Sequence, residues 1–372
     1  MAKITYNKST SKGKKRTSVL VPLLLIPLGL VIVLLGYSMS IFTMDNDKER
    51  VSMASASTSS NYDYKVDDQC KNIPSIRSGS TYFLSDKVKP ASSPENVEPS
   101  FKVGSYMGEK ATNHMREDAQ GNFILVKDVV KKREGGLVFD MGANQGFFTY
   151  YLAALGMQVH SFEIDERNFQ SLQHGTQYNS KEVSDRVHLY PIGLGEKNAR
   201  LSIKGGEYEG FLKEGDGGPI LGVTFDCFAH HMQDTLDISN VAFVKLDVEG
   251  FEIAVLKGAQ NSLFKHGYSK VGGMLMEVGP NRWGRASIDF ATGLDEMKKL
   301  STHFESSHIL VRTGGRFART CPTSLAESVL SDKNPKVLDA VKVFKVKIDE
   351  WEQLLTQMNE KDYDCNFFYN NK

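Results

Sequence analysis

The sequence predicts an α/β protein with a mostly parallel, doubly wound sheet that follows a single membrane-spanning helix. Three observations support this prediction. Short apolar runs alternate with helical patterns from about residue 101, a glycine-rich turn follows the first strand-like run, and residues 19–42 carry no charge. Strands that alternate with helices favour a parallel sheet. About 20 apolar residues are the length that a helix needs to cross the hydrocarbon core.

The apolar run at residues 19–42 is interpreted as a signal-anchor helix. Its first 17 positions, residues 19–35, contain no polar side chain. A cleaved signal peptide is the alternative, but its apolar region would be about 7–15 residues long and closely followed by small residues. Here the nearest such triplet, residues 54–56, lies well beyond the run. We therefore expect an anchor that is retained.

The charge on either side of the span predicts its orientation. Residues 1–18 carry six Lys and Arg side chains and no acidic residue, whereas both signs mix after the span. The positive-inside rule makes residues 1–18 a cytosolic tail and places residues 43–372 on the other side. This is a type II arrangement, typical of enzymes of the Golgi or another secretory-pathway membrane.

The remaining charge argues against a nucleic-acid partner. Removing those six residues from the 45 basic ones leaves 39 against 45 acidic residues. Nucleic-acid affinity depends mainly on Lys and Arg that neutralise phosphates. A chain with this balance has no such overall attraction.

All four cysteines lie beyond the predicted span, at positions 70, 227, 321 and 365. An oxidising lumen would permit disulfides, and four cysteines allow three pairings that the sequence does not distinguish. A buried thiol is an equal interpretation of Cys227. No C-x-x-C or H-x-x-x-H spacing occurs, and His114, His230 and His231 stand apart from such patterns, so no metal site is predicted.

Composition divides the part beyond the span into two. Residues 43–100 are rich in Ser, Asp, Asn, Lys and Pro and predict a flexible stem. Residues 101–372 form the predicted catalytic domain, with its core at 135–280. The expected strands share short apolar runs bounded by turns, at residues 137–139, 159–163, 187–191, 241–246, 273–278, 307–311, 341–346 and 365–369. The expected helices are residues 147–155, 167–178 and 250–257.

The strongest local signal is the turn Asp140-Met-Gly142-Ala-Asn144-Gln-Gly146, between the first strand and the first helix. Glycines let a backbone approach a ligand closely, and the first turn of a helix offers unpaired N–H groups. Asn at position 144 departs from the dinucleotide G-x-G-x-x-G, and no P-loop Gly-Lys-Ser/Thr follows. The turn alone is weak evidence for a nucleotide-like ligand.

Glu163 strengthens that evidence. It ends the second expected strand, 17 residues after Gly146. An acid at that point can accept hydrogen bonds from ribose hydroxyls. The ordinary alternative is a solvated acid at a strand end.

With these residues the chain resembles the FkbM-type methyltransferases. The matching stretches cover about residues 135–280, namely residues 138–149, 161–165, 191–195, 244–252 and 255–259. The resemblance implies a Rossmann-like class I methyltransferase fold with a seven-stranded, mostly parallel sheet. It also implies the cofactor S-adenosyl-L-methionine and methyl transfer that usually goes to oxygen.

The same resemblance implies roles for particular residues. Asp140, Gly142 and Gly146 would shape the amino-acid end of the cofactor pocket, with Asn144 in the same loop, and Glu163 would hold the ribose. Ile164 stands where the family usually has proline, which puts only the adenine contact in doubt.

Asp247 and Glu277 are the candidate catalytic residues. They follow the fourth and fifth expected strands and should face the same sheet edge as the glycine loop. A hydroxyl acceptor must lose a proton, which a nearby carboxylate can take. The alternative for Asp247 is to orient its loop by accepting backbone N–H bonds. For the neighbouring acids Glu249 and Glu252, the alternative is to complement the dipole of the following helix.

Trp283 follows the Glu277 strand and could either face a sugar or simply pack in the core. The aromatic side chains that flank the glycine loop, between residues 139 and 151, are expected mostly in the core.

The favoured function is O-methylation of a small-molecule or glycan acceptor, most simply a glycan or lipid-linked hydroxyl in the secretory pathway. A type II glycosyltransferase is the alternative enzyme. It would want an Asp-x-Asp after a strand, and residues 45–47 and 362–364 are both badly placed for it. A non-catalytic module that retains the fold is the third possibility.

Overall fold

A central sheet of nine strands organises the computed structural model, which describes residues 70, 86–205, 210–214, 220–264, 271–314 and 320–371. The predicted cytosolic tail, the predicted span at residues 19–42 and residues 43–85, apart from Cys70, lie outside the described residues. Within the described ranges, no helix combines the length and the apolar character that a membrane crossing requires.

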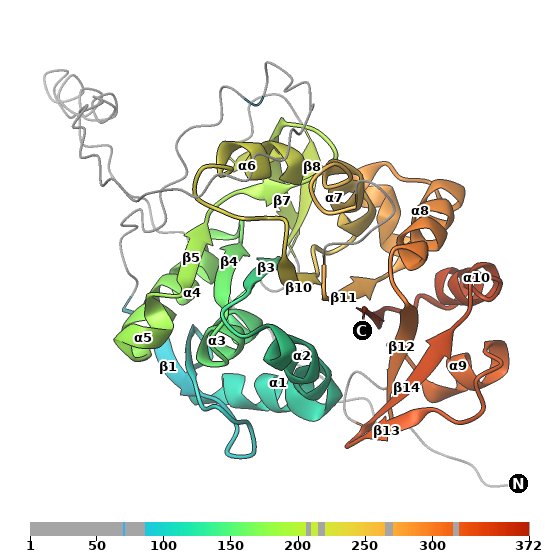
Figure 1. Cartoon of the computed structure of the whole chain (residues 1–372), viewed down its shortest axis with the longest axis horizontal. Coiled ribbons are helices and arrows are strands. Elements are labelled where there is room, and N and C mark those ends of the chain that lie inside the picture. The colour runs from blue at the N-terminus through green and yellow to red at the C-terminus, as the bar shows by residue number, and fades with distance from the viewer. Residues whose placement is uncertain are drawn as a thin grey trace, which may run out of the picture. The chain divides into compact units, whose positions relative to one another are not determined.

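The strands of this sheet follow one another in the order β13-β14-β12-β15-β11-β10-β3-β4-β5 (Figure 1). In that order their bounds are Lys336–Leu338, Val341–Val346, Ser306–Arg312, Cys365–Asn370, Gly273–Val278, Val241–Leu246, Leu137–Met141, Gln158–Phe162 and Val187–Tyr190. Neighbouring strands from β11 to β5 run parallel. Those from β11 to β13 pair antiparallel. The predicted α/β class is confirmed as a mixed sheet.

The strand count differs from the predicted seven. β13 and β14 form an antiparallel pair that extends the sheet beyond β12. The apolar run at residues 341–346 belongs to this added edge, whereas β15 lies between β11 and β12. Apolar alternation identifies such strands but does not say which neighbour each one pairs with.

Successive side chains of the central strands pack alternately into two separate hydrophobic cores. Val138, Phe243 and Leu275 belong to one buried cluster, and their chain neighbours Phe139, Val244 and Met276 belong to the other. Successive residues of a strand point to opposite faces. Both faces of the sheet are therefore covered, as expected for strands without a polar side.

Helices cover each face (Figure 1). One side carries the helices before and between the first strands: α1 (Ala111–Asp118), α2 (Ile124–Val130), α3 (Phe147–Ala154), α4 (Glu166–Tyr178) and α5 (Lys181–Ser184). The other side carries α6 (Phe225–His231), α7 (Glu252–Gly258), α8 (Phe290–Thr302) and α10 (Trp351–Lys361), and α9 (Thr323–Val329) packs against α10 and β12. The 3₁₀ segments η2 (Gly108–Lys110), η4 (Lys131–Arg133) and η6 (Pro280–Ala286) and a π-helical segment, η3 (Ala119–Phe123), complete the described helices.

Local signals explain where the predicted helices begin. The carboxylate of Asp165 accepts bonds from the backbone amides of Arg167 and Asn168 and so caps α4. Such a cap satisfies amides that have no partner within the helix. α3 begins after Gly146, whose φ of +92° is readily adopted only by glycine.

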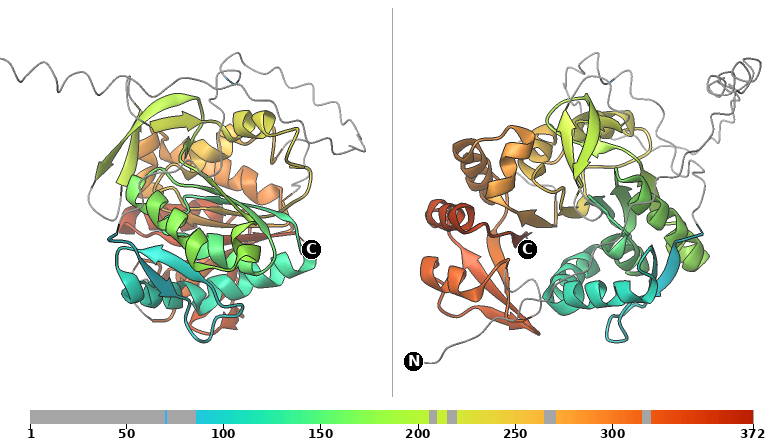
Figure 2. Two further views of the ribbon diagram at one scale, coloured as in Figure 1. Left: turned by 90° about the vertical axis from the view of Figure 1, so that its left-hand side faces the viewer. Right: turned by 180° about the vertical axis from the view of Figure 1, so that it is seen from behind.

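A second, four-stranded sheet lies between β5 and α6 in the chain (Figure 2). Its order is β6-β9-β7-β8, with bounds Gly193–Leu194, Ile220–Val223, Ala199–Gly205 and Gly210–Glu214. The sequence analysis did not predict this sheet, because its strands are short and rich in glycine and charge.

The folded region begins before residue 101. β1 (Lys89–Ser92) pairs antiparallel with β2 (Lys102–Ser105), and Val88, Ala91 and Val97 are buried. Residues 86–100 of the predicted stem therefore belong to the folded domain.

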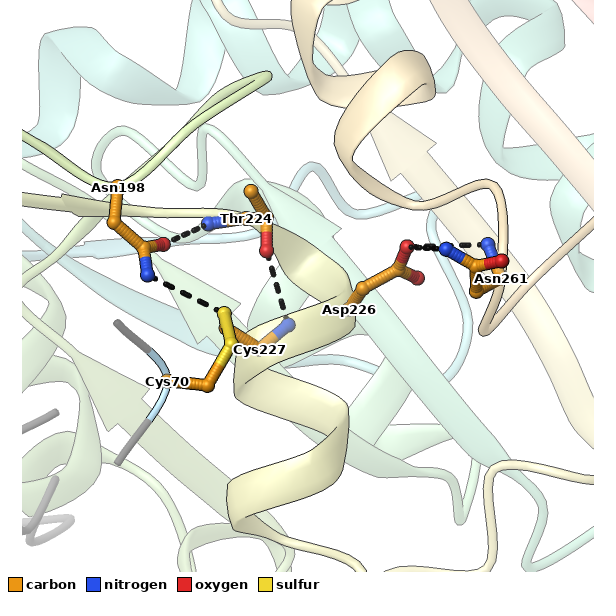
Figure 3. The surroundings of a disulfide bond; sticks show 6 residues. All are labelled: Cys70, Asn198, Thr224, Asp226, Cys227 and Asn261. Atoms are coloured by element: carbon orange, nitrogen blue, oxygen red, sulfur yellow. Dashed lines mark hydrogen bonds between the residues drawn. A yellow bond between two sulfur atoms is a disulfide. The ribbon is translucent and has the colours of Figure 1, made fainter. Parts of the chain in front are cut away.

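Two disulfides resolve the pairing of the cysteines. Cys70 is bonded to Cys227, and Cys321 is bonded to Cys365. Figure 3 shows the first bond beside α6, where the Cys227 amide donates to Thr224 Oγ1 at 3.0 Å. Cys227 is thus not a free buried thiol. Its disulfide fixes residue 70 to the start of α6.

Candidate functional site

A cavity of about 750 Å³ opens at the carboxyl ends of β3, β4, β10 and β11. Ligands of open parallel sheets bind at this edge. The cavity has two chemically different ends. We call one the glycine-loop end, bordered by Gly142, Asn144, Glu163, Ile164 and Ile192, and the other the carboxylate end, bordered by Asp247, Glu249, Glu277, Arg282 and Asp364.

Gly142 occupies a position that only glycine can fill. Its φ is +84°, and a Cβ there would lie 1.8 Å from the backbone oxygen of Asp247. The Asp247 amide in turn donates to the Met141 oxygen at 3.0 Å. The loops after β3 and β10 are therefore in direct backbone contact, which joins the two ends of the cavity.

The other predicted residues of the glycine loop divide between the cavity and the structure beneath it. Asn144 borders the cavity, and its side chain accepts a bond from the Gln145 amide at 2.8 Å. Gly146 does not border the cavity. A Cβ at Gly146 would instead meet Leu172 and Tyr150, so its role is to let α3 pack closely.

Glu163 fastens the glycine-loop end. Its Oε2 accepts from the Asn144 amide at 2.7 Å, and its Oε1 accepts from the amides of Ile164 and Asp165 at 2.9 and 2.8 Å. Burial raises the pKa of Glu163 to about 7, although the amide bonds favour the ionised form. A carboxylate oxygen has two lone pairs, so Oε2 retains capacity for one more donor.

Apolar side chains complete this end. Ile164, which stands in place of the family's usual proline, borders the cavity together with Ile192 and Leu194. They form an apolar wall next to Glu163, suited to a flat ring such as adenine.

Asp140 lies beneath the cavity wall and does not border it. It is fully buried, and its Oδ2 accepts a 2.6 Å bond from Thr149 Oγ1. The Lys245 ammonium lies 3.8 Å from Asp140 Oδ1. Asp140 therefore acts on the site through the residues above it.

Lys245 links Asp140 to the loops, and the sequence analysis did not single it out. Its Nζ donates to the Gly142 oxygen at 2.6 Å and lies 3.2 Å from Asp247 Oδ2. Burial alone would lower the pKa of Lys245, but the charges of Asp247 and Asp140 outweigh it and raise the pKa. A lysine within an apolar strand run, with an acid two residues later, was the available signal.

The carboxylate end brings both predicted catalytic residues together. Oxygen atoms of Asp247, Glu249 and Glu277 lie within 4.8 Å of one another. Burial, followed by the charges of Asp247 and Glu249, raises the pKa of Glu277 well above its ordinary value. Such a set of oxygens could hold a cation, whereas the sequence predicts no metal.

Arg282 supplies positive charge to this cluster. Its Nη1 lies 2.6 Å from Glu249 Oε2 and 3.4 Å from Glu277 Oε2, and its Nη2 pairs with Asp364. Asp364 belongs to the Asp-x-Asp pair that looked badly placed from the sequence, yet it borders the cavity. The turn between α10 and β15 brings it there from near the C-terminus.

Several other expectations are settled by the same geometry. Trp283 is 1% exposed and packs against Phe290, so it is a core residue. Phe148 belongs to the core, as expected, and also borders the cavity, as does His114. The Glu252 carboxylate accepts hydrogen bonds from the backbone amides of Val248 and Gly250 and so stabilises the loop at the start of α7.

A parallel sheet edge that combines a glycine turn with an acid after the second strand is the usual ligand-binding edge of Rossmann-like proteins. Residues 140–301 match the family model described as methyltransferase FkbM domain. This match confirms, for residues 140–301, the resemblance to the FkbM-type methyltransferases noted in the sequence.

Solved structures of methyltransferases are similar to the chain at low identity. An O-methyltransferase from Bacillus cereus in complex with SAH is 11% identical, with 64% of this chain and 90% of that chain covered and a TM-score of 0.34. A precorrin-6y C5,15-methyltransferase from Geobacter metallireducens is 9% identical over 67% and 87%, with a TM-score of 0.31. The N-terminal domain of human METTL16 is 9% identical over 68% and 69%, with a TM-score of 0.33. No curated protein matches the chain.

Proposed function

We propose that this protein transfers a methyl group from S-adenosylmethionine to a hydroxyl group of a glycan or lipid-linked acceptor, on the lumenal side of a secretory-pathway membrane. The observation that carries this proposal is the single cavity that joins the glycine-loop end to the carboxylate end. The first end suits a nucleoside, and the second can receive a proton.

The glycine-loop end fits the cofactor. The cavity volume of about 750 Å³ falls in the range of about 300–1,000 Å³ typical of small-molecule sites. Glu163 Oε2 would accept a ribose hydroxyl, the wall of Ile164, Ile192 and Leu194 would face the adenine, and Gly142 would permit close backbone approach. When bound, S-adenosylmethionine supplies a methyl group on a sulfonium, and the electron pair of the broken C–S bond stays on sulfur.

The carboxylate end would serve the acceptor. Positioning of the two reactants contributes much of the catalysis in a displacement of this kind. As its oxygen takes the methyl group, the acceptor hydroxyl gives its proton to Asp247 or Glu277. Burial and the charges of Asp247 and Glu249 raise the pKa of Glu277, which makes its carboxylate a stronger base than an ordinary glutamate.

The disulfides support the proposed location. All four cysteines of the chain are in disulfides. Such bonds persist in oxidising compartments and are rare in the cytosol. Together with the predicted anchor at residues 19–42, this favours a type II protein with its enzyme domain in the lumen. Protease treatment of sealed microsomes tests it, because digestion of the domain without detergent would place the domain in the cytosol.

Binding to the full chain in detergent separates the competing enzyme classes. Calorimetry should detect S-adenosylmethionine and S-adenosylhomocysteine, but not a UDP-sugar. Binding of the UDP-sugar alone would overturn the proposal in favour of a glycosyltransferase. Transfer of a labelled methyl group to an amine, and not to a hydroxyl, would overturn its O-methylation part.

A further inference from the structure

We infer that the carboxylate end selects an uncharged, hydroxyl-rich acceptor, such as an unmodified sugar ring, and excludes acceptors that carry a carboxylate, sulfate or phosphate near the reacting hydroxyl. This inference rests on the proposed function. It adds a statement about the charge of the acceptor, which is uncharged near the reacting hydroxyl.

The balance of charge at this end is negative. Asp247, Glu249, Glu277 and Asp364 border it, and Arg282 contacts the last three. Two other cations nearby are already engaged: Lys245 is shared between Asp247 and the buried Asp140, and Arg285 lies 3.7 Å from Glu249 Oε2. An anionic acceptor would therefore meet more carboxylates than cations at close range, where like charges repel strongly.

Arg312, another cation that borders the cavity, does not offset this balance. It is 7% exposed and lies 3.3 Å from the carboxylate of Asp118, and its Nη1 donates to the Glu117 oxygen. Arg312 is thus engaged with the end of α1. An acceptor anion would have to compete with Asp118 for it.

A cationic acceptor would have to compete with cations that are already present. Each carboxylate at this end already faces a cation, because Lys245 lies 3.2 Å from Asp247 and Arg282 contacts Glu249, Glu277 and Asp364. An ammonium group would have to displace one of these partners. Hydroxyl groups can donate to carboxylates and accept from a guanidinium without adding charge.

A buried amide in the same cavity points independently to a ligand that carries a hydrogen-bond donor. Asn122, from the π-helical segment η3, is 2% exposed and borders the cavity. Its Oδ1 has no hydrogen-bond partner in the described part of the chain. A buried polar atom without a hydrogen-bond partner destabilises the structure. A ligand hydroxyl can donate to the oxygen of this amide or accept from its nitrogen.

The register of the sheet adds a second amide on this side. Asn366 on β15 pairs directly with Glu277 on β11 and with Leu310 on β12, and it borders the cavity. Side chains of directly paired residues point to the same face of a sheet. Uncharged amides from η3 and β15 thus accompany the carboxylates, a combination suited to several hydroxyl groups on one molecule.

The inference is tested with sugars that share one ring and differ in their charge. The full chain in detergent, saturated with S-adenosylhomocysteine, is titrated with the methyl glycosides of glucose, galactose and mannose and with their uronate and 2-amino counterparts. Saturation-transfer NMR reports binding, and labelled methyl transfer reports use. At least one neutral ring should bind, and each ring that binds in its neutral form should bind about tenfold or more tightly in that form than in either charged form.

Two outcomes overturn the inference: a uronate or amino sugar that binds as well as its neutral counterpart, or no binding by any neutral ring. The proposed function fails separately, if S-adenosylhomocysteine itself is not bound. If S-adenosylhomocysteine is bound but a charged sugar binds as well as its neutral counterpart, the inference about the acceptor fails and the proposed function stands.

Charge-removing variants locate the selectivity. Glu249→Gln and Asp364→Asn each remove one negative charge with little change in shape, and each should reduce discrimination against the uronate several-fold. Glu352→Gln removes the same charge at an exposed site, where it pairs with Lys298, and should leave discrimination unchanged. Thermal unfolding checks that each variant is folded. Unchanged discrimination in both folded site variants would contradict the assignment of selectivity to this cluster.

Discussion

The backbone amide of Asn144 donates a 2.7 Å hydrogen bond to the carboxylate of Glu163. This bond joins the glycine loop after β3 to the end of β4, 19 residues further along the chain. The residue predicted to hold the ribose therefore also fixes the position of the glycine loop. Loss of its charge should affect both functions at once.

The first prediction concerns the ionisation of Glu163. Burial raises its pKa to about 7, and the ionised form is the better acceptor for a ribose hydroxyl. Affinity for S-adenosylhomocysteine should therefore be highest above pH 7 and should fall by up to about tenfold per pH unit as the pH decreases below 7. The Glu163→Gln variant should bind S-adenosylhomocysteine more weakly, and its affinity should lack this dependence on pH. Calorimetry of both proteins from pH 6 to 9 measures the difference, and identical pH profiles would contradict the role.

The second prediction concerns the contact between the two loops. Gly142→Ala would place a methyl group 1.8 Å from the Asp247 oxygen at a φ of +84°. We expect a loss of about 2 kcal/mol or more in the free energy of unfolding, together with loss of cofactor binding. Gly195→Ala is the matched control, because a Cβ at Gly195 meets nothing within 4 Å. Thermal unfolding and calorimetry check both, and a variant at position 142 with unchanged stability would refute the steric argument.

The third prediction separates the two candidate proton acceptors. The two variants are Asp247→Asn and Glu277→Gln. The variant that removes the base should lower turnover by about 10²-fold or more and leave cofactor affinity little changed. The measurement is labelled methyl transfer to the best neutral glycoside. If Asp247→Asn instead weakens cofactor binding and keeps turnover at saturation, Asp247 is a binding residue and Glu277 is the better candidate. If both variants have wild-type turnover and cofactor affinity, neither Asp247 nor Glu277 is the proton acceptor.

The fourth prediction concerns Lys245. Lys245→Met would leave the carboxylates of Asp140 and Asp247 without their common cation, and Asp140 is fully buried. Removal of one partner of a buried ion pair costs about 3–5 kcal/mol. Lys298→Met breaks an exposed pair with Glu352 and should cost less than about 1 kcal/mol. Chemical denaturation compares the two, and equal small losses would show that Lys245 has no such role.

The fifth prediction compares the disulfides. Both bonds close long loops, with sequence separations of 157 and 44 residues, so removal of either should cost about 2–4 kcal/mol of stability. Cys321 borders the cavity, and Asp364 directly precedes Cys365. The double variant Cys321→Ser, Cys365→Ser should therefore also weaken binding of the neutral glycoside. The double variant Cys70→Ser, Cys227→Ser should retain it, and equal weakening in both would contradict a local effect.

Much of the parallel half of the fold could be predicted from local signals. The apolar runs that became β3, β4, β5, β10 and β11 are buried on both faces, so they read as continuous hydrophobic segments bounded by turns. The glycine turn and Glu163 were predictable for the same reason. Each follows a strand end, and parallel strands bring their carboxyl ends to one edge.

The carboxylate end illustrates what the sequence determined by itself and what it did not. It determined that Asp247 and Glu277 would share a sheet edge, because the two residues end parallel strands. Only the tertiary structure decided that Arg282 and Asp364 would join them, that Lys245 would connect to Asp140, and that Asp140 and Gly146 would lie beneath the cavity. The antiparallel return of β15, the added β13–β14 edge and the cysteine pairing also had to come from the structure. The physical reason is that strand ends and turns are encoded by neighbouring residues, whereas ion pairs, disulfides and strand order depend on contacts between segments far apart in the chain.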